Sequence, residues 1–322
     1  MYRKTIAVIG GSGFIGTRLV ELLIDAGHSV RIIDKQNSSK YPELRLAGDV
    51  RSIDEMVSGC GGCDVIYNLA AEHKDDVRPI SLYDDVNVQG ARNVCEAASR
   101  LGINEIIFTS SVAIYGFSPH ELNEEASIGY INDYGRTKYE AEQVYLEWVR
   151  ADSSRRLRML RPTAVFGEGN RGNVYNLIRQ IGKKHFVMVG DGENRKSIAY
   201  VGNVAACLRF LLEIDSQQVA IFNYADKPDL KMNELVPIVR SAFGYGENLP
   251  PRLPDFVIYP IATVLDALAA VTGKSFPVSR VRVQKFCSNS QFATDRLLQA
   301  GFVPGYELRK ALVRTIKAEF GV

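Results

Sequence analysis

The first 34 residues constrain the fold more than any other part of the chain. An apolar run from Thr5 to Ile9 precedes the glycine-rich turn GGSGFIG. An amphipathic stretch from Phe14 to Ala26 follows, and a second apolar run ends in Asp34. This order of strand, glycine turn, helix, strand and carboxylate is typical of a βαβ unit that binds a dinucleotide. The glycine pattern alone would be weak evidence, but this context makes it specific.

Each glycine of the turn has an expected task in holding the cofactor. Gly10 makes the turn, Gly13 allows close approach of the backbone, and Gly16 allows the helix to pack on the strand. The helix N-terminus offers free N–H groups and a positive dipole end to a pyrophosphate. The Asp34 carboxylate is expected to bind the ribose hydroxyls and to repel a 2′-phosphate, which favours NAD over NADP. Lys35 beside it weakens that preference.

Short apolar runs continue to alternate with helical segments along the first half. LRLAGDV, CDVIYNLAA and INEIIFTSS read as buried strands, separated by helices around 52–59 and 80–101. This alternation predicts an α/β fold with a doubly wound parallel sheet of the Rossmann type. Ligands of such folds lie at the carboxyl ends of the strands, where Asp49 is expected to reach the adenine. The further expected cofactor contacts are Phe14, Ile15, Val50, Leu69, Ala70 and Ala71.

Three residues with complementary chemistry are expected to converge beside the nicotinamide. Ser110 and Ser111 follow the apolar run IIF, at the edge of the sheet that carries the glycine turn. Tyr134 and Lys138 of YGRTK lie four apart at the start of a helical stretch and so share one face. Ser111 would orient a carbinol hydroxyl, Tyr134 would remove its proton, and Lys138 would lower the tyrosine pKa. On spacing alone, an ordinary surface helix is the favoured interpretation, and the rest of the chain must decide.

The bulk composition excludes several classes of protein. A formal net charge of +2 gives no electrostatic case for nucleic acid. The sequence has no signal-peptide layout and no run of about 18 apolar residues. Five scattered cysteines indicate a reducing cytoplasm. Cys60 and Cys63 form a lone CxxC without two further ligands at comparable spacing, so no metal site is expected.

Nine motifs occur in the order found in the extended short-chain dehydrogenases/reductases. The chain resembles the NAD-dependent sugar epimerase/dehydratase branch of that family. The resemblance implies that Ser111, Tyr134 and Lys138 are the catalytic trio and that Lys138 also holds the nicotinamide ribose. It also implies a sugar diphosphate substrate and a homodimer formed through the helices at about 80–101 and 134–150. The motifs are GGSGFIG, Asp34, GDV, NLAA, VNVQGARNV, TSSVAIYG, YGRTK, RPTAVFG and AYVGNVA.

The residues after the catalytic serine narrow the reaction. Sugar 4,6-dehydratases resemble one another in carrying acidic residues there, whereas this chain has Val112 and Ala113. Epimerisation, simple oxidation or ketone reduction remain. In a 4-epimerase, C4 gives a hydride to NAD and takes it back on the other face. A net reductase would more often use NADPH and ranks second, and a non-catalytic NAD(H)-binding regulator on the same fold is a further alternative.

Three departures from the common family pattern indicate an unusual carrier for the sugar. Ala164 replaces an asparagine, Lys196 is a point charge without the fork of an arginine, and Asn203 replaces an aspartate. The chain resembles a narrower bacterial group, 4-epimerases that interconvert GlcNAc and GalNAc on undecaprenyl diphosphate for O-antigen assembly. The alternatives are a UDP-GlcNAc or UDP-glucose 4-epimerase and a nucleotide 4-keto-6-deoxy-sugar reductase. This narrower resemblance rests on AAEHKDDVRPISLYDDVNVQG, FGEGNRGNVYNLIRQI, KSIAYVGN, NYADKPDLKMNELV and VTGKSFPVSRVRVQKFC.

The substrate contacts are predicted from looser matches to the family. Asn176, Lys196 and Arg282 are expected to bind the diphosphate. Asn289 or Ser290 is expected at the place that admits an N-acetyl group, because bulky tyrosine excludes it in some relatives. A solvated loop is the equal alternative for this last pair.

The segment 253–271 is unusually apolar for the substrate half of such an enzyme. Its stretch from Ile261 to Val271 reads as a helix, and Pro254 and Pro260 are expected to break the segment. One interpretation places it in a lipid interface, so that the cytoplasmic protein would have peripheral contact with the inner membrane. The alternative is a core or dimer-contact helix. Basic residues that would meet anionic headgroups are Arg252, Lys274, Arg280, Arg282 and Lys285.

Two domains are expected. Residues 1–166 and 196–225 would form the NAD-binding Rossmann domain. Residues 167–195 and 226–322 would form a smaller α/β substrate-binding domain. The chain returns to the first domain through SIAYVGNVAACLRFLLEI and AIFNYAD.

Overall fold

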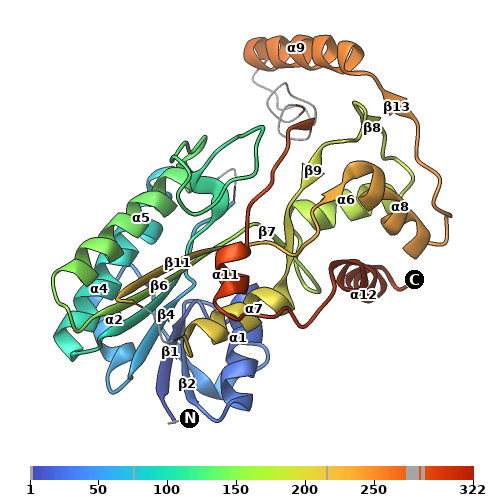
Figure 1. The fold of residues 1–322 in the computed structure, drawn as a ribbon. Helices are drawn as coiled ribbons and strands as arrows, with labels where there is room; N and C mark the ends of the chain where they lie inside the picture. The colour runs from blue at the N-terminus through green and yellow to red at the C-terminus, as the bar shows by residue number, and fades with distance from the viewer. Residues whose placement is uncertain (1–2, 75–76, 215–216, 273–282, 284–286) are drawn as a thin grey trace.

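Seven parallel strands form the central sheet, in the order β11-β6-β5-β4-β1-β2-β3 (Figure 1). The computed structural model describes residues 3–74, 77–214, 217–272, 283 and 287–322. The strand order reverses between β1 and β4, which is the switch point at which such sheets bind dinucleotides. The predicted doubly wound α/β fold is confirmed. The strands are β1 (Thr5–Ile9), β2 (Ser29–Asp34), β3 (Arg45–Ala47), β4 (Val65–Asn68), β5 (Glu105–Thr109), β6 (Arg156–Pro162) and β11 (Val219–Tyr224).

Helices cover both faces of this sheet and bury most of it, while the edge strand β3 stays largely exposed. Successive strand residues enter opposite cores, as Ile6 and Ala7 of β1 show, which explains why the strands read as continuous apolar runs. One face carries α1 (Phe14–Asp25) and α7 (Val201–Leu211). The other face carries α2 (Ile53–Cys60), α4 (Gly90–Leu101) and α5 (Asp133–Arg150) (Figure 1).

The helical segment predicted around 80–101 is one continuous helix with a π-helical stretch inside it. It begins as α3 (Ser81–Tyr83), widens into the π-helical η2 (Asp84–Gln89) and continues as α4. Single π-helical turns inside α-helices often mark functional sites. Here Asn87 of the wide turn reaches α5. Asn87 donates to Thr137 Oγ1 at 2.9 Å and to the Glu72 carbonyl at 3.0 Å.

A second, smaller core lies beside the carboxyl edge of the sheet. Three helices pack around it: α6 (Asn173–Gly182), α8 (Met232–Ala242) and α12 (Leu308–Phe320). Three two-stranded sheets complete this part, and α11 (Asp295–Gln299) returns the chain to the main sheet. The strand pairs are β7 (Ala164–Phe166) with β10 (Ile198–Tyr200), β9 (Arg195–Lys196) with β12 (Leu230–Lys231), and β8 (Met188–Val189) with β13 (Arg252–Leu253). The remaining short helices are η1 (Pro42–Leu44) and η3 (Val112–Ile114).

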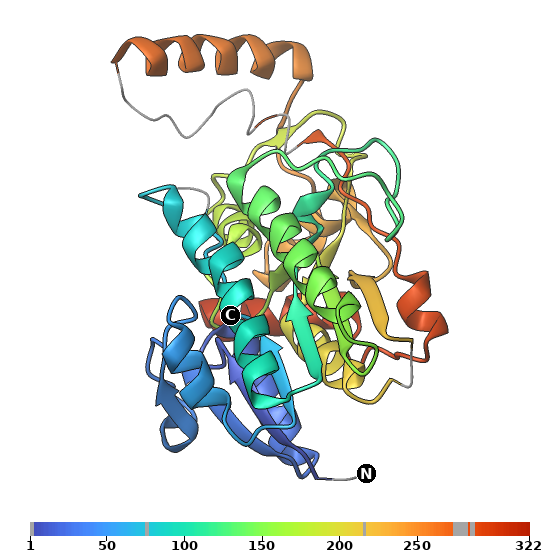
Figure 2. The ribbon, with the colours of Figure 1, turned by 90° about the vertical axis from the view of Figure 1, so that its left-hand side faces the viewer.

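Helix α9 (Asp255–Thr272) projects from this smaller part, beyond the main body in both views (Figures 1 and 2). Its first turns attach through Ile258 and Tyr259, which pack with residues of β8 and β13. The prediction that Pro260 breaks the segment is wrong, because the helix runs through it. Proline removes one backbone hydrogen bond, to the Phe256 carbonyl, and this carbonyl lies at the exposed start of the helix. No helix within the described ranges is long and apolar enough to cross a membrane.

Candidate active site

The glycine turn between β1 and α1 forms a cradle that side chains would fill. Gly10 has φ +77°, and a Cβ there would lie 2.7 Å from the Ala70 nitrogen. A Cβ on Gly16 would lie 2.4 Å from the Gly10 carbonyl oxygen. Gly13, the N-cap of α1, has no side chain to bond the amides of the first turn. Those amides are therefore available to a pyrophosphate, so this part of the site fits a dinucleotide.

The structure brings the predicted cofactor residues of β1, β2 and β4 together around this cradle. Asp34 ends β2, and its carboxylate accepts from the Ser12 amide at 3.0 Å and the Gln36 amide at 2.9 Å. Leu69 and Ala70 follow β4 and lie against Gly10. Ser12 was not among the predicted residues, although its place inside GGSGFIG puts its amide beside the Asp34 carboxylate.

Two of the predicted cofactor residues also serve the packing of the structure. Phe14 and Ile15 open α1 and lie against the smaller core. Arg18 stacks on the Phe14 ring, with its guanidinium carbon 4.9 Å from the ring centroid. The cradle is thus fixed to both parts of the molecule.

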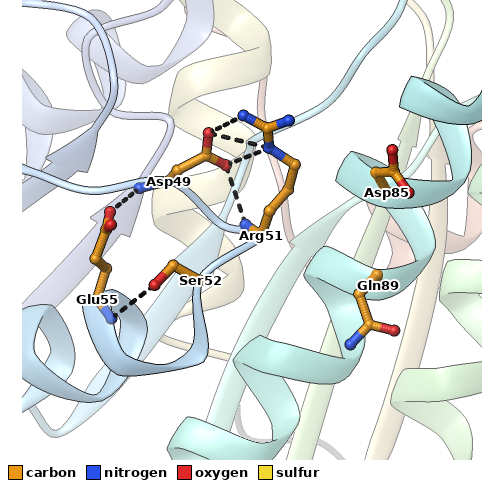
Figure 3. A pocket seen from close by; sticks show the side chains of 6 residues that line it. All are labelled: Asp49, Arg51, Ser52, Glu55, Asp85 and Gln89. Carbon is orange, nitrogen blue, oxygen red and sulfur yellow. Dashed lines mark hydrogen bonds and ion pairs between the residues drawn. The ribbon is translucent and has the colours of Figure 1, made fainter. Parts of the chain in front are cut away.

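Beyond β3, a pocket opens beside Asp49 (Figure 3). The Asp49 carboxylate pairs with Arg51, with Nη2 at 2.6 Å from Oδ2. The Arg51 guanidinium lowers the pKa of Asp49. This pairing was not predicted from the sequence. The expected contact of Asp49 with the adenine stays a prediction. Val50 beside it is buried, and its carbonyl accepts from Asn93 Nδ2 at 2.9 Å. The pocket is lined by Asp49, Arg51, Ser52, Glu55, Asp85 and Gln89.

Ser111 and Tyr134 meet where β5 and α5 approach each other. Ser111 caps η3, and its hydroxyl also hydrogen-bonds the Tyr134 phenol. Asn132 caps α5 by accepting from the Gly135 amide at 2.8 Å. A Cβ on Gly135 would lie only 2.4 Å from the Ala113 carbonyl oxygen. Direct backbone contact between α5 and η3 therefore sets the spacing of Ser111 and Tyr134.

Lys138 lies one turn further along α5 and is buried, with 2 % of its surface exposed. Its ammonium donates to the Thr109 carbonyl at 2.7 Å and lies 4.6 Å from the centroid of the Phe108 ring. Burial lowers the pKa of Lys138 to about 7, and Glu142 opposes this. The helical placement of Tyr134 and Lys138 on one face agrees with the sequence interpretation.

The predicted lowering of the Tyr134 pKa is wrong. Burial raises the pKa of this phenol, and the hydrogen bond to Ser111 only partly opposes the increase. The reason is that burial disfavours the charged form of either group. It raises the pKa of the Tyr134 phenol and lowers the pKa of the Lys138 ammonium. The Tyr134 hydroxyl is therefore protonated at neutral pH in this structure.

Three of the predicted substrate residues gather around β9. The Lys196 ammonium donates to the Ser288 carbonyl at 2.5 Å. Ser290 forms a bridge with Lys196, and Asn289 Oδ1 accepts from the Arg195 amide at 2.9 Å. The segment continues to Phe292, which bridges Leu122 in the loop after Ser111. It thus connects β9 to the loop that follows Ser111.

The other two predicted substrate residues are placed differently. Asn176 is half-buried on α6. Arg282 lies outside the described residues, as do Lys274, Arg280 and Lys285 of the basic set.

Asn203, one of the departures from the family pattern, has a structural explanation. Its amide donates to Asp226 Oδ1 and to the Tyr306 carbonyl, both at 2.8 Å, and its oxygen accepts from the Tyr306 amide. Asp226 is buried, and burial raises its pKa. An aspartate at 203 would place a second carboxylate beside Asp226, whereas the Asn203 amide donates a hydrogen bond to the Asp226 carboxylate.

The CxxC pair is part of the core. Cys60 and Cys63 are both buried free thiols, and burial raises the pKa of Cys60 to about 12. In the part of the chain that the structure describes, no three potential metal ligands cluster.

Comparison with known proteins identifies the family. The model of the NAD dependent epimerase/dehydratase family matches residues 6–225. The chain belongs to this family. The chain is 44 % identical, over 98 % of its length and 95 % of the relative, to the N-acetyl-alpha-D-glucosaminyl-diphospho-ditrans,octacis-undecaprenol 4-epimerase of Escherichia coli O157:H7. The resemblance inferred from the motifs is confirmed.

Solved structures of similar proteins share the fold. MoeE5 in complex with UDP-glucose and NAD superposes with a TM-score of 0.75 at 22 % identity, covering 98 % of each chain. UDP-N-acetylglucosamine 4-epimerase from Bacillus cereus gives a TM-score of 0.77 at 18 % identity, covering 99 % of this chain and 97 % of that one. NAD, the cofactor expected from the sequence, is confirmed by the family and fits the glycine cradle.

Proposed function

We propose that this enzyme is an NAD-dependent 4-epimerase that interconverts GlcNAc and GalNAc carried on undecaprenyl diphosphate, for O-antigen or other surface polysaccharide assembly. The observation that carries the proposal is the 44 % identity, over nearly the full length, to an epimerase named for that substrate. The juxtaposed Ser111 and Tyr134 supply the chemistry that such a reaction needs. Val112 and Ala113 in η3 carry no carboxylate and so favour epimerisation over loss of water.

The catalytic residues would act on the C4 hydroxyl of the sugar. Ser111 donates a hydrogen bond to the C4 oxygen and orients it beside Tyr134. Tyr134 must first lose its own phenolic proton to solvent. As the phenolate, it then takes the C4 hydroxyl proton while the ketone forms and returns that proton when the ketone is reduced on the other face. Bound NAD supplies a reversible hydride acceptor, so no cofactor is consumed overall. Lys138, fixed to the Thr109 carbonyl, provides positive charge next to the phenol.

The residues proposed to hold NAD are those that the sequence predicts at the carboxyl ends of the strands. The glycine turn and Asp34 would bind the pyrophosphate and the adenosine ribose, and the residues after β4 would line the nicotinamide side. Arg51 joins this set through its pairing with Asp49.

The sugar diphosphate would lie between β9 and α6. Lys196 lies on β9, where its ammonium donates to the Ser288 carbonyl, and Asn176 lies half-buried on α6. Asn289 and Ser290, both smaller than tyrosine, would leave room for an N-acetyl group. We also propose that 1–166 with 196–225 is the NAD-binding domain, and that 167–195 with 226–322 binds the substrate.

Helix α9 supports a lipid-linked substrate in place of a nucleotide-linked one. Its exposed large apolar side chains include Phe256 at 79 % and Val264 at 59 %. Ile261, Val264 and Leu268 recur at helical spacing and are all exposed. A projecting helix with such a face fits the interfacial layer of a membrane, where it would bring the site to its lipid-linked substrate. We propose peripheral contact with the cytoplasmic face of the inner membrane.

Vesicle flotation tests the role of α9. Wild-type protein should float with vesicles of phosphatidylethanolamine and phosphatidylglycerol, whereas a Phe256→Ser/Val264→Ser variant should stay in the soluble fraction. The matched control, Val303→Ser, removes an equally exposed apolar residue outside α9 and should float. Equal flotation of wild type and the α9 variant would contradict the interfacial role. A protein that never floats but forms dimers that the α9 variant abolishes would assign the helix to a dimer contact.

The homodimer implied by the family resemblance would use α4 and α5, which lie side by side on one face of the sheet. Light scattering of purified protein at micromolar concentration tests this proposal. A mass of one chain would contradict it.

The substrate itself is tested by parallel incubation with GlcNAc-diphospho-undecaprenol and UDP-GlcNAc, without added cofactor. GalNAc formed only from the lipid-linked sugar is the expected result. GalNAc formed only from UDP-GlcNAc would contradict the lipid carrier and indicate an ordinary nucleotide-sugar epimerase. A steady change in NAD(P)H absorbance with a 4-keto sugar would instead indicate the reductase.

A further inference from the structure

Helix α5 buries a carboxylate one turn beyond Lys138. Glu142 is 0 % exposed and follows Lys138 at the i, i+4 spacing that places side chains on one helical face. Its Oε1 accepts from the Ser110 hydroxyl at 2.5 Å and from Arg161 Nε at 2.8 Å. Its Oε2 accepts from Arg161 Nη2 at 2.6 Å. A charged group buried this completely persists only where several partners hold it.

Arg161, at the end of β6, connects this carboxylate to the rest of the sheet edge. Its Nη1 donates to the Tyr115 hydroxyl at 2.5 Å, and this hydroxyl donates to Asn223 Oδ1 at 2.9 Å. Strands β6 and β11 therefore fix the position of the Glu142 carboxylate. Ser110, which links it to β5, directly precedes the catalytic Ser111.

The surroundings of Lys138 show why this carboxylate matters. The ammonium contacts only neutral groups at close range, the Thr109 carbonyl and the Phe108 ring. Within the described residues, Glu142 is the one charged group that acts on it, with the Arg161 cation behind the carboxylate and the neutral Tyr134 phenol one turn before.

Other acidic groups on the elements packed against α5 have different partners. Asp84 of η2, together with Asp133 and Glu140 of α5 itself, pairs with Arg136. Asp85 of η2 faces Arg51. Glu142 is thus the acidic group placed to offset the cost of burying the Lys138 charge.

We propose that Glu142 is a positioning residue, which keeps Lys138 charged and directed at the Thr109 carbonyl, while Arg161 and Ser110 hold its carboxylate in place. This inference rests on the role proposed above for Lys138. It assigns a function to a buried ion pair whose stabilising effect alone would be small, since well-packed apolar residues often replace such pairs without loss.

The test is the titration of Lys138 in Glu142→Gln protein, without substrate. The ¹³Cε resonance of Lys138, identified by its absence in Lys138→Met, reports the charge directly. An opposite charge nearby typically raises the pKa of an ammonium by about 1 unit or more. The midpoint in Glu142→Gln is therefore expected about 1 pH unit or more below that of wild type. The alkaline limb of kcat/KM should move to lower pH by the same amount, because the charged form is lost as pH rises through the pKa.

Two variants serve as controls. Glu140→Gln removes a carboxylate of the same helix that pairs with Arg136, and it should leave the Lys138 midpoint unchanged. Glu142→Asp keeps the charge and should restore most of the wild-type midpoint. If Glu142→Gln fails to fold, Glu142→Gln/Arg161→Gln removes both buried charges together and should show a shift in the same direction.

An unchanged Lys138 midpoint in folded Glu142→Gln, or in folded Glu142→Gln/Arg161→Gln where the single variant does not fold, would overturn the proposal and leave the ion pair a purely structural feature. The failure of the proposed function looks different. Wild-type protein would then epimerise neither lipid-linked nor nucleotide-linked sugar, while the Lys138 midpoint would still move in Glu142→Gln.

Discussion

Gly135→Ala should separate Ser111 from Tyr134, the proposed catalytic pair, without unfolding the protein. The added Cβ would lie 2.4 Å from the Ala113 carbonyl oxygen and 2.9 Å from the Tyr130 Cβ. An ordinary contact begins near 3.4 Å, so the start of α5 must move away from η3 by about 1 Å. Tyr134 lies next to this position, and Ser111 lies on the other side of the contact.

The expected magnitude follows from that displacement. A misplacement of about 1 Å between reacting groups can reduce turnover by about 100-fold. The free energy of unfolding should fall only modestly. Overpacking costs about 1–3 kcal/mol, and the higher helix propensity of alanine offsets up to about 1 kcal/mol of that cost. NAD binding should persist, since the glycine cradle is on α1.

The assay is the rate of GalNAc formation by Gly135→Ala, with bound NAD and the melting temperature measured on the same protein. Gly305→Ala is the matched control, because a Cβ there meets nothing within 4 Å. It should behave as wild type. Wild-type turnover by folded Gly135→Ala would refute the conclusion that this backbone contact sets the Ser111–Tyr134 spacing.

Three further predictions test other parts of the site. Tyr134→Phe should lose about 10²–10⁴-fold in turnover while retaining NAD, measured as nucleotide released on denaturation; near-normal turnover would exclude Tyr134 as the acid–base group. Asn203→Asp should cost about 1–3 kcal/mol, because it sets a second carboxylate beside Asp226. Burial raises the folded-state pKa of Asp226, so the stability lost in Asn203→Asp should grow as pH rises. The melting temperature of Asn203→Asp should therefore fall more between pH 5.5 and pH 8 than that of wild type. An equal fall in both proteins would contradict this prediction. Asp34→Ser should relax the preference for NAD over NADP in binding titrations, and an unchanged preference would show that Asp34 does not face the ribose.

The sequence predicts those parts of the molecule whose determinants are local. The glycine turn, the first two strands and Asp34 follow from a pattern of about 30 residues. The structure places the turn after β1, beside the switch point, and Asp34 at the end of β2, where it accepts from the Ser12 amide. The start of α5 was also predictable, because Asn132 caps it and good helix formers follow. Tyr134 and Lys138 consequently lie on one helical face.

The remaining features depend on contacts between distant segments. The pairing of Glu142 with Arg161 joins a helix to a strand, and nothing in either local pattern indicates it. The pKa of Tyr134 was predicted in the wrong direction because spacing reveals a neighbouring cation but not the extent of burial. Pro260 was interpreted as a helix breaker, yet a proline near the exposed start of a helix costs only one hydrogen bond.

The most direct test of the central claim uses GlcNAc-diphospho-undecaprenol that carries deuterium at C4. Transient oxidation and reduction within one site returns the same hydride to the sugar. The GalNAc product formed in ordinary water should therefore retain the deuterium at C4 and gain none from solvent. Product that has exchanged C4 deuterium for solvent hydrogen would show proton abstraction from carbon, and it would contradict the epimerisation mechanism assigned to Ser111, Tyr134 and Lys138.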